Sequence, residues 1–199
     1  MPIYGLVSFA EAAAIERSLL RLAQRFPNDN LQILEIGIEK GRTSRGIRDW
    51  LAQNNIKNYT HWCVDLGRSG QEKPYPDVRM VWGDSAEVFS LIPTHIHWVF
   101  IDGCHCTNHV MADVAHYGNK LVPGGEMIVH ATFDQVPIFQ DYQDHGPRDR
   151  AEFHVLGGRI ALRLLGLLPI VRSDYKFVEE IKYPTFDGSV GAIVYEKVM

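Results

Sequence analysis

Four apolar runs of strand length, each with an acidic residue at or beside its end, constrain the fold of this chain more than any other feature. The runs cover residues 31–36, 59–64, 78–82 and 96–101, and their acids are Glu35, Asp65, Asp84 and Asp102. The spacing leaves room for crossover helices, and alternating strands and helices favour a parallel, doubly wound α/β sheet. Parallel strands end at one sheet edge, where such folds bind ligands, so the acids are predicted to meet there. A single acid often only caps a helix, but four in succession favour a binding site.

The first run continues through Gly37 and Gly41 into an amphipathic helix. A strand that ends at Glu35 and turns through two glycines lets a ligand lie against bare backbone, which suits a nucleotide-like group. Two glycines four residues apart also fit a plain tight turn between a strand and a helix. This segment alone therefore leaves both interpretations open. Thr43 or Ser44 is predicted to cap the helix that follows.

The segments at the two ends of the chain complete the predicted architecture. Ser8 and Glu11 form a capping-box pattern, which predicts an N-terminal helix from Ser8 to about Phe26. The later elements are predicted in this order: a short helix 86–92 capped by Asp84 or Ser85, a helix from Thr107 stopped by residues 123–125, a strand 127–129, a helix 153–168, and alternating strands 175–183 and 190–198. The turn at Asp187 and Gly188 makes the last two strands an antiparallel hairpin added to a parallel sheet.

Composition narrows the class of protein. The 199 residues suit one domain, and 46% hydrophobic with 22% charged residues is ordinary for a globular protein. A formal net charge of -4 argues against a broad basic surface for nucleic acid, and the apolar runs are too short to span a membrane. The N-terminus lacks the pattern of a secretion signal, so a cytoplasmic location is expected. Cys63, Cys104 and Cys106 fit neither a disulfide framework nor a paired-cysteine metal motif, and free thiols are predicted.

The expected organisation is a single domain over residues 1–199, with residues 1–30 as an N-terminal helical extension. Residues 133–150 mix aromatic and acidic side chains without a clean period. A stretch of this length inside a compact domain is usually functional, so residues 133–150 are predicted to form an active-site loop. A plain surface loop is the alternative.

Five segments, in this order, resemble the class I S-adenosylmethionine-dependent methyltransferases, and within them the small-molecule branch similar to catechol-type O-methyltransferases. The segments are residues 35–41, 64–65, 83–89, 100–105 and 121–125. The middle glycine of the family's common Gly-x-Gly-x-Gly form is Glu39 here. The resemblance implies an enzyme with S-adenosylmethionine as its cofactor. It also implies a Rossmann-like methyltransferase fold, in which a doubly wound, mostly parallel seven-stranded sheet carries an antiparallel C-terminal hairpin.

The resemblance also assigns the cofactor to the predicted sheet edge. Glu35 would attract the ammonium group of the methionine part, and Gly37 and Gly41 would admit that part against the backbone. Asp65 would accept hydrogen bonds from both ribose hydroxyls, a task that suits the paired oxygens of a carboxylate. The residues implied for the adenine are Asp84, which takes the amino group, and Ser85 and Ala86, which lie beside the ring.

Asp102 and His105 are the catalytic residues that the resemblance implies, and Asp102 also counts among the cofactor-binding residues. In metal-dependent relatives the acid at the end of strand four binds a divalent cation, and the residue three positions later is the general base. The ordinary pKa of histidine suits that role. A surface histidine on a loop is the alternative for His105. Transfer from a sulfonium is a direct displacement, so catalysis rests on alignment and on removal of the acceptor's proton.

Strand five departs from the family pattern. It should end in an acid that completes the metal site, but the chain has His130, Ala131 and Thr132 instead. Whether a metal is bound is therefore left open, with Asp102, His105 and His130 as candidate ligands for a softer metal such as zinc or iron. The other histidines of this region are predicted to be surface or packing residues: His95, His97, His109 and His116.

The leading hypothesis is methyl transfer from S-adenosylmethionine to an oxygen, or less favourably a nitrogen, of a small molecule. The alternative, motivated by the departure at Ala131, is a catalytically silent protein that binds S-adenosylmethionine for regulation or assembly. A nicotinamide-dependent oxidoreductase is disfavoured, because the turn after Glu35 lacks the Gly-x-Gly-x-x-Gly spacing. The predicted partner is a small-molecule acceptor, with no nucleic acid and no membrane. A homo-oligomer formed through the N-terminal helix or residues 133–150 is left open.

Overall fold

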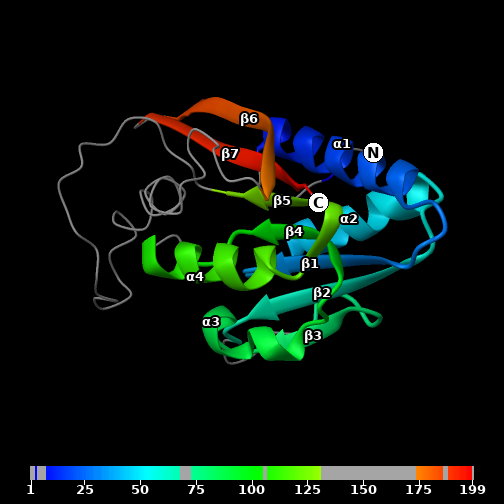
Figure 1. Cartoon of the computed structure of the whole chain (residues 1–199), viewed down its shortest axis with the longest axis horizontal. Coiled ribbons are helices and arrows are strands. Elements are labelled where there is room, and N and C mark those ends of the chain that lie inside the picture. The colour runs from blue at the N-terminus through cyan, green and yellow to red at the C-terminus, as the bar shows by residue number, and fades with distance from the viewer. Residues whose placement is uncertain are drawn as a thin grey trace.

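The computed structural model describes residues 3, 8–67, 73–104, 107–130, 174–185 and 188–198 (Figure 1). The elements in chain order are α1 (Phe9–Arg25), β1 (Leu31–Ile36), α2 (Arg42–Gln53), β2 (Tyr59–Asp65), β3 (Arg79–Trp82), α3 (Ser85–Val88), the 3-10 turn η1 (Phe89–Leu91), β4 (Ile96–Ile101), α4 (Thr107–Gly118), β5 (Leu121–Val129), β6 (Tyr175–Thr185) and β7 (Gly188–Lys197). The predicted loop 133–150, the predicted helix 153–168 and the turn residue Asp187 lie outside the described residues. Within the described ranges, no helix is long and apolar enough to cross a membrane.

One seven-stranded sheet runs through the molecule in the order β3-β2-β1-β4-β5-β7-β6. Strands β1 to β5 are parallel, and β7 pairs antiparallel with both β5 and β6. The predicted parallel sheet with a C-terminal hairpin is therefore confirmed. Strand β1 lies between β2 and β4, so the winding of the sheet reverses beside β1. The carboxyl ends of β1 and β4 mark the switch point, where ligands of open α/β sheets bind.

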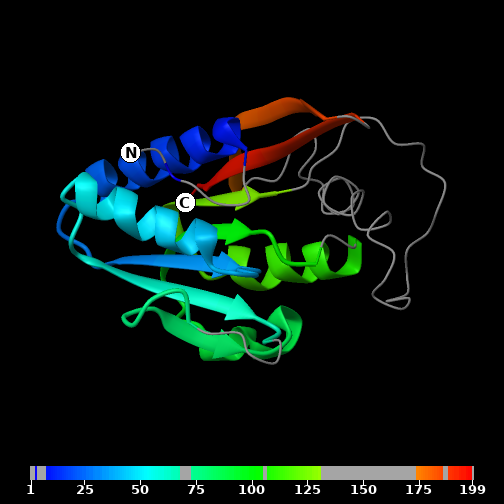
Figure 2. The same ribbon diagram turned by 180° about the vertical axis from the view of Figure 1, so that it is seen from behind.

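Alternating side chains of the central strands build one apolar layer on each face of the sheet. On β1, Leu34 and Ile36 face a core shared with α4, whereas Leu31 and Ile33 face a core shared with α1 and α2. This period of two is what an extended strand imposes. Figure 1 shows α4 in front of the sheet, and the view from behind in Figure 2 shows α1 and α2 covering the opposite face. Helices on both faces explain why β1 and β4 are buried along their whole length.

The N-terminal helix begins as the sequence predicts. The Ser8 hydroxyl accepts a hydrogen bond from the Glu11 backbone N–H at 3.2 Å, and the Glu11 carboxylate accepts one from the Ser8 N–H at 3.0 Å. This capping box satisfies two backbone donors at the start of α1. Ile15 and Leu19 then pack into the core on the α2 side of the sheet. Helix α1 is thus held to the sheet by its apolar face.

The predicted cap of α2 is wrong. Thr43 and Ser44 are both buried within the first turn of the helix, and the N-cap is Gly41, which makes no side-chain cap. Gly41 has a φ of 63°, in the left-handed region that favours glycine. The chain therefore enters α2 through the backbone conformation of Gly41 instead of a side-chain hydrogen bond.

The boundaries around α3, α4 and β5 also differ from the prediction. The helix predicted over residues 86–92 ends at Val88 and gives way to the 3-10 turn. Helix α4 ends at Gly118, and residues 123–125 lie inside β5 instead of stopping the helix. The pairing of β5 with β4 shifts register along this stretch, and Gly124 has a φ of 80°. Residues 123–125 therefore form a bulge that the strand accommodates, because glycine adopts that backbone conformation readily.

Candidate functional site

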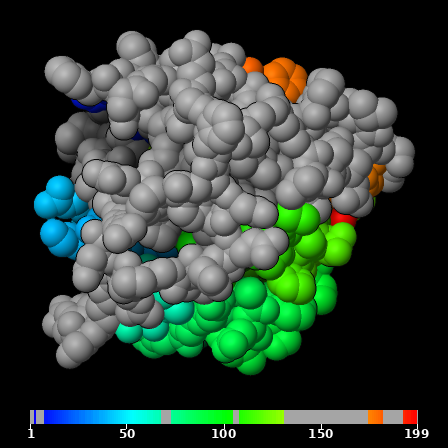
Figure 3. Space-filling view, turned by 90° about the vertical axis from the view of Figure 1, so that its left-hand side faces the viewer, coloured from blue at the N-terminus to red at the C-terminus, as the bar shows by residue number. Residues whose placement is uncertain are grey.

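The carboxyl ends of the parallel strands lie at the end of the molecule that faces the viewer in Figure 3, where light-blue atoms of the segment after β1 and green atoms of the α3 and α4 region are visible. At this edge, Gly37 joins β1 to β2 and β4. Its N–H donates to Val64 O at 2.9 Å, while the Asp102 N–H donates to Ile36 O at 2.8 Å. Gly37 has a φ of 80°, and a Cβ there would overlap the backbone of Asp102 and Gly103. Only glycine allows this close approach of the two strand ends.

Gly41 has a different neighbour. A Cβ on Gly41 would lie 2.5 Å from the Cβ of Pro74, so its lack of a side chain makes room for the loop before β3. Glu35 is likewise placed inside the protein: its side chain is fully buried and lies beside His61 and Cys63. The predicted contacts of Glu35, Gly37 and Gly41 with the methionine part of a cofactor stay predictions.

Asp65 connects the end of β2 to the glycine turn. Its Oδ2 accepts hydrogen bonds from the N–H groups of Ile38 at 2.9 Å and Glu39 at 3.1 Å, and its Oδ1 accepts one from Gly67 N–H at 3.2 Å. Glu39 has a φ of 48°, which is uncommon for a side chain larger than hydrogen. A carboxylate has about four acceptor positions, so Asp65 keeps capacity for a further donor. The structure thus brings Asp65 to the turn, as the strand-end pattern predicts.

Asp84 caps α3 and also contacts α4. Its Oδ1 accepts a hydrogen bond from the Ala86 N–H at 2.9 Å, and its Oδ2 lies 3.3 Å from Nε2 of His109. Ser85 belongs to the same first turn, and its carbonyl accepts a hydrogen bond from the Tyr117 hydroxyl at 2.7 Å. The cap predicted for Asp84 is confirmed. From the sequence, His109 is predicted to be a surface or packing residue. Its position beside Asp84 depends on the packing of α4 against α3.

On the other side of Gly37, His130 lies between two carboxylates. Its Nε2 is 3.4 Å from Oδ1 of Asp102, and its Nδ1 is 2.5 Å from Oε1 of Glu11. Asp102 directly follows β4, His130 directly follows β5, and Glu11 is in the first turn of α1. The sequence prediction missed Glu11, because it is 119 residues away from His130 and already has a role in the capping box. No local sequence pattern predicts such a contact.

The two carboxylates decide the charge of His130. Burial lowers the pKa of its ring, but the neighbouring carboxylates of Asp102 and Glu11 raise it more, and the pKa reaches about 9. Near neutral pH, His130 is therefore an imidazolium whose positive charge lies between two acids. An imidazolium in this position holds α1 against the end of β4.

The same geometry bears on the predicted metal site. Donor atoms 3.4 Å apart, as in Asp102 and His130, can share one divalent ion. A metal-bound histidine usually donates its other ring nitrogen to a carboxylate, which is the position of Glu11. The proton on His130 competes with such an ion for Nε2. The third candidate, His105, and the neighbouring Ala131 lie outside the described residues.

Comparison with a family model decides the class of protein. Residues 34–132, which span the glycine turn, Asp65, Asp84, Asp102 and His130, match the model of a methyltransferase domain. The chain belongs to the class I S-adenosylmethionine-dependent methyltransferases. The resemblance predicted from the sequence motifs is confirmed, and so is S-adenosylmethionine as the cofactor of this methyltransferase. No curated protein sequence matches the chain.

Solved structures share the fold of this methyltransferase. The O-methyltransferase NovP has a TM-score of 0.65 at 13% identity, over 98% of this chain and 82% of NovP. An O-methyltransferase from Bacillus cereus, solved in complex with SAH, has a TM-score of 0.57 at 15% identity, over 96% of this chain and 87% of that protein. MycE, solved with Mg, SAH and mycinamycin VI, has a TM-score of 0.56 at 16% identity, over 98% of this chain but only 51% of MycE. At these identities the likeness establishes the fold.

Proposed function

We propose that this methyltransferase transfers the methyl group of S-adenosylmethionine to an oxygen atom of a small molecule. The observation that carries the proposal is the group formed by Asp102, His130 and Glu11 at the switch point of a methyltransferase sheet. NovP and the Bacillus cereus protein are O-methyltransferases by name, and MycE was solved with mycinamycin VI, which supports an oxygen in a small molecule as the acceptor. The net charge of -4 favours a small molecule over a nucleic acid.

The cofactor is proposed to lie across the carboxyl ends of β1, β2 and β3. Asp65 would accept the ribose hydroxyls and Asp84 the adenine amino group, with Ser85 and Ala86 beside the ring. The support is that the two acids are close: the Gly83 N–H, next to Asp84, donates to the Asp65 carbonyl at 2.9 Å. Both carboxylates are partly exposed, so a ligand can reach them.

The methionine part is proposed to follow the turn at Gly37 and Gly41 towards β4. Glu35 would act on its ammonium group from within the protein, since its carboxylate is buried below the turn. On this course the reactive methyl group would lie near Asp102, just beyond the paired ends of β1 and β4.

Methyl transfer from S-adenosylmethionine needs no covalent intermediate with the protein. The acceptor oxygen forms a bond to the methyl carbon, the bond from carbon to sulfur breaks, and the acceptor's proton must leave. Asp102 and His105 are proposed to position the acceptor and remove that proton, because a base within reach of the hydroxyl speeds the displacement. A divalent ion held by Asp102 and His130 would lower the pKa of the acceptor hydroxyl. Within the chain, His130 fixes the Asp102 carboxylate by charge and contact.

The cofactor site is tested by binding to the Asp65→Ala variant. Asp65 holds the turn and is proposed to hold the ribose, so the variant should lose most of its affinity for S-adenosylhomocysteine, which isothermal titration calorimetry measures directly. Asp49→Ala is the matched control, because Asp49 is an acid on α2 that contacts the neighbouring Arg48. Unchanged affinity in Asp65→Ala, with a folded protein by circular dichroism, would refute the proposed site.

A catalytically silent S-adenosylmethionine-binding protein is the second candidate. The absence of an acid at Ala131 favours it, because that position completes the metal site in metal-dependent relatives. This candidate predicts full affinity for the cofactor, no methylated product across a panel of catechols and other hydroxyl acceptors, and no effect of His105→Ala. A cytoplasmic location and a homo-oligomer also stay predictions.

A further inference from the structure

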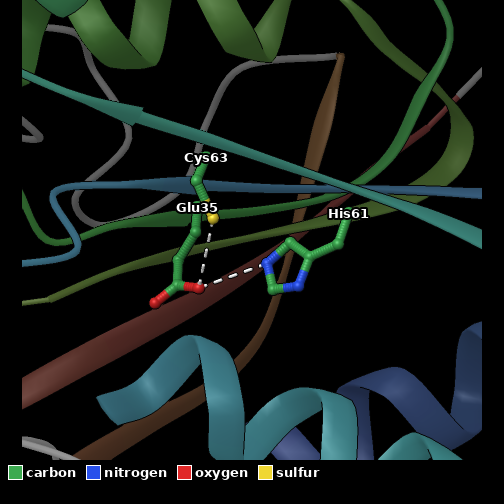
Figure 4. A group of neighbouring side chains, drawn as sticks. All are labelled: Glu35, His61 and Cys63. Carbon is green, nitrogen blue, oxygen red and sulfur yellow. Dashed lines mark hydrogen bonds and ion pairs between the residues drawn. The ribbon is translucent and has the colours of Figure 1, made fainter. Parts of the chain in front are cut away.

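Glu35, His61 and Cys63 form a buried cluster of three potential metal ligands beneath α2 (Figure 4). Their exposed fractions are 0%, 2% and 0%. The strand pairing explains the cluster: Glu35 of β1 is directly opposite Cys63 of β2, and His61 is two residues earlier on the same face of β2. Figure 4 shows all three side chains directed towards one another.

The spacing of the donor atoms suits a single ion. One donor atom from each residue lies within 4.8 Å of the other two. Nε2 of His61 is 3.2 Å from Oε2 of Glu35, and Sγ of Cys63 is 4.0 Å from the same oxygen. With bonds of about 2.0 Å to nitrogen or oxygen and about 2.3 Å to sulfur, tetrahedral ligand atoms are separated by roughly 3.3–3.8 Å. Small side-chain adjustments therefore bring these three atoms into a zinc-like arrangement.

The hydrogen bonding of the cluster is incomplete without an ion. Oε1 of Glu35 has no hydrogen-bond partner among the described residues, although it is buried. Nε2 of His61 also lacks a partner with hydrogen-bond geometry within that part of the chain, despite its short distance to Glu35. Buried polar atoms nearly always have a partner, so two unsatisfied atoms at one place call for an explanation. A cation held by Nε2 and by both oxygens of Glu35, or by Oε2 with a metal-bound water molecule donating to Oε1, satisfies both atoms.

The donor types indicate which ion fits the cluster. Burial and the neighbouring Glu35 carboxylate raise the pKa of the Cys63 thiol well above its ordinary value, so an ion must displace the thiol proton to bind the sulfur as a thiolate. A divalent ion displaces that proton to solvent, and its two positive charges balance the Glu35 carboxylate and the Cys63 thiolate. The donor set of one nitrogen, one sulfur and one carboxylate oxygen is typical of zinc. Magnesium and calcium take oxygen ligands.

Tyr75 completes the arrangement. Its hydroxyl is 2.5 Å from Nδ1 of His61, so an Nδ1–H that donates to Tyr75 leaves the lone pair of Nε2 for the cluster. His61 and Tyr75 also line a cavity of about 320 Å³, together with Arg48 and Arg79.

We propose that Glu35, His61 and Cys63 bind a zinc-type divalent cation that ties β1 to β2 beneath the glycine turn. The second oxygen of Glu35, or a water molecule, fills the fourth position. This site is separate from Asp102 and His130, but it shares Glu35 with the proposed cofactor site, so the ion and the ammonium group of the cofactor are alternative partners of that carboxylate. The proposal does not depend on methyl transfer.

The test is cobalt substitution in the full chain. Protein stripped of metal with a chelator and reloaded with cobalt should take up one ion that shows the ultraviolet charge-transfer band of a thiolate ligand. Cys63→Ser and His61→Gln should lose this band. Cys104→Ser and Cys106→Ser should keep it, and so should Asp102→Asn, which separates this site from the sheet edge. A band that survives Cys63→Ser, or that disappears with Cys104→Ser or Cys106→Ser, overturns the proposal.

X-ray absorption of the zinc-loaded natural chain provides a readout that needs no variant to fold. The expected result is one sulfur ligand at about 2.3 Å and nitrogen or oxygen ligands at about 2.0 Å. Zinc without a sulfur ligand, or no bound zinc, overturns the proposal even where Cys63→Ser is unfolded.

Discussion

At Gly37 the absence of a side chain lets the ends of β1 and β4 meet. A Cβ there would overlap the backbone of Asp102, and the φ of 80° disfavours any other residue. Gly37→Ala should therefore lower the free energy of unfolding by more than the roughly 1–2 kcal/mol that a left-handed backbone alone costs an L-residue. Urea denaturation measures the loss.

Gly67→Ala is the control for this prediction. Gly67 has a similar φ of 71°, but the nearest atom to a Cβ there, among the described residues, belongs to the side chain of Trp82 at 3.0 Å and not to backbone. Its destabilisation should be smaller than that of Gly37→Ala. Equal losses would mean that the contact with Asp102 contributes nothing.

His130 makes stability depend on pH. Its pKa of about 9 in the folded protein is above the ordinary value of 6.5, so the bound proton stabilises the fold. The contribution is fully present below about pH 6.5 and is lost as the pH rises through about 9. The difference between the two pKa values corresponds to a stabilisation on the order of 3 kcal/mol. The gap in unfolding free energy between the natural chain and His130→Gln should therefore shrink by about that amount across this range in metal-free buffer.

The exposed His95 supplies the comparison for the pH series. His95→Gln removes a histidine whose side chain is in solvent, so it should leave the free energy of unfolding nearly unchanged. A gap between the natural chain and His130→Gln that stays constant from pH 6 to pH 9 would contradict a protonated His130.

At the scale of elements, a buried charge holds α1 to the sheet. Glu126 of β5 has an exposed fraction of 0% and accepts two hydrogen bonds from Arg21, at 2.9 and 2.7 Å, and one from Ser18 at 2.6 Å. Removing Arg21 leaves this carboxylate buried without its cation. Arg21→Ala should therefore lower the free energy of unfolding by about 3 kcal/mol, measured by urea denaturation.

Arg17→Ala is the matched control on the same helix. Arg17 contacts Glu179 at 2.7 Å, but its side chain is 51% exposed, so the loss should stay below about 1 kcal/mol. A large loss in both variants would show that α1 depends on its arginines in general and not on the pair with Glu126.

Elements with a regular pattern could be predicted from the sequence, and irregular ones could not. Strand β1 and the capping box at Ser8 follow local rules of periodicity and hydrogen bonding, and both are found as predicted. Residues 123–125 have the composition of a helix stop, but pairing with β4 absorbs them as a bulge. Tertiary pairing overrides local preference there, and no local sequence pattern reports it.

Some residues of the candidate site could likewise be predicted from the sequence, and others could not. The acids at strand ends could be predicted because the topology of a parallel sheet brings every carboxyl end to one edge. Glu11 and the cluster at His61 could not, because each depends on contacts between residues distant in the chain. Sequence motifs report where the backbone turns, whereas these contacts depend on how whole elements pack.

At the scale of the whole molecule, the fold brings Asp65, Asp84 and Asp102 to one edge of the sheet, at or just after the carboxyl ends of β2, β3 and β4. Such an edge favours a ligand with positive charge, which the sulfonium of S-adenosylmethionine carries. At the proposed position the cofactor would bridge the ends of β1, β2 and β3 and reach towards β4, so it should stabilise the domain as a unit.

The expected stabilisation depends on the ligand concentration relative to its Kd. A ligand that binds only the folded protein adds about 2.7 kcal/mol to the free energy of unfolding when its concentration is 100 times its Kd. S-adenosylhomocysteine at that ratio, with the Kd taken from calorimetry, should raise the free energy of unfolding in urea by this amount. NAD at the same concentration should leave it unchanged, because the turn after Glu35 lacks the glycine spacing of a dinucleotide site. Stabilisation by NAD but not by S-adenosylhomocysteine would assign this edge to a different cofactor.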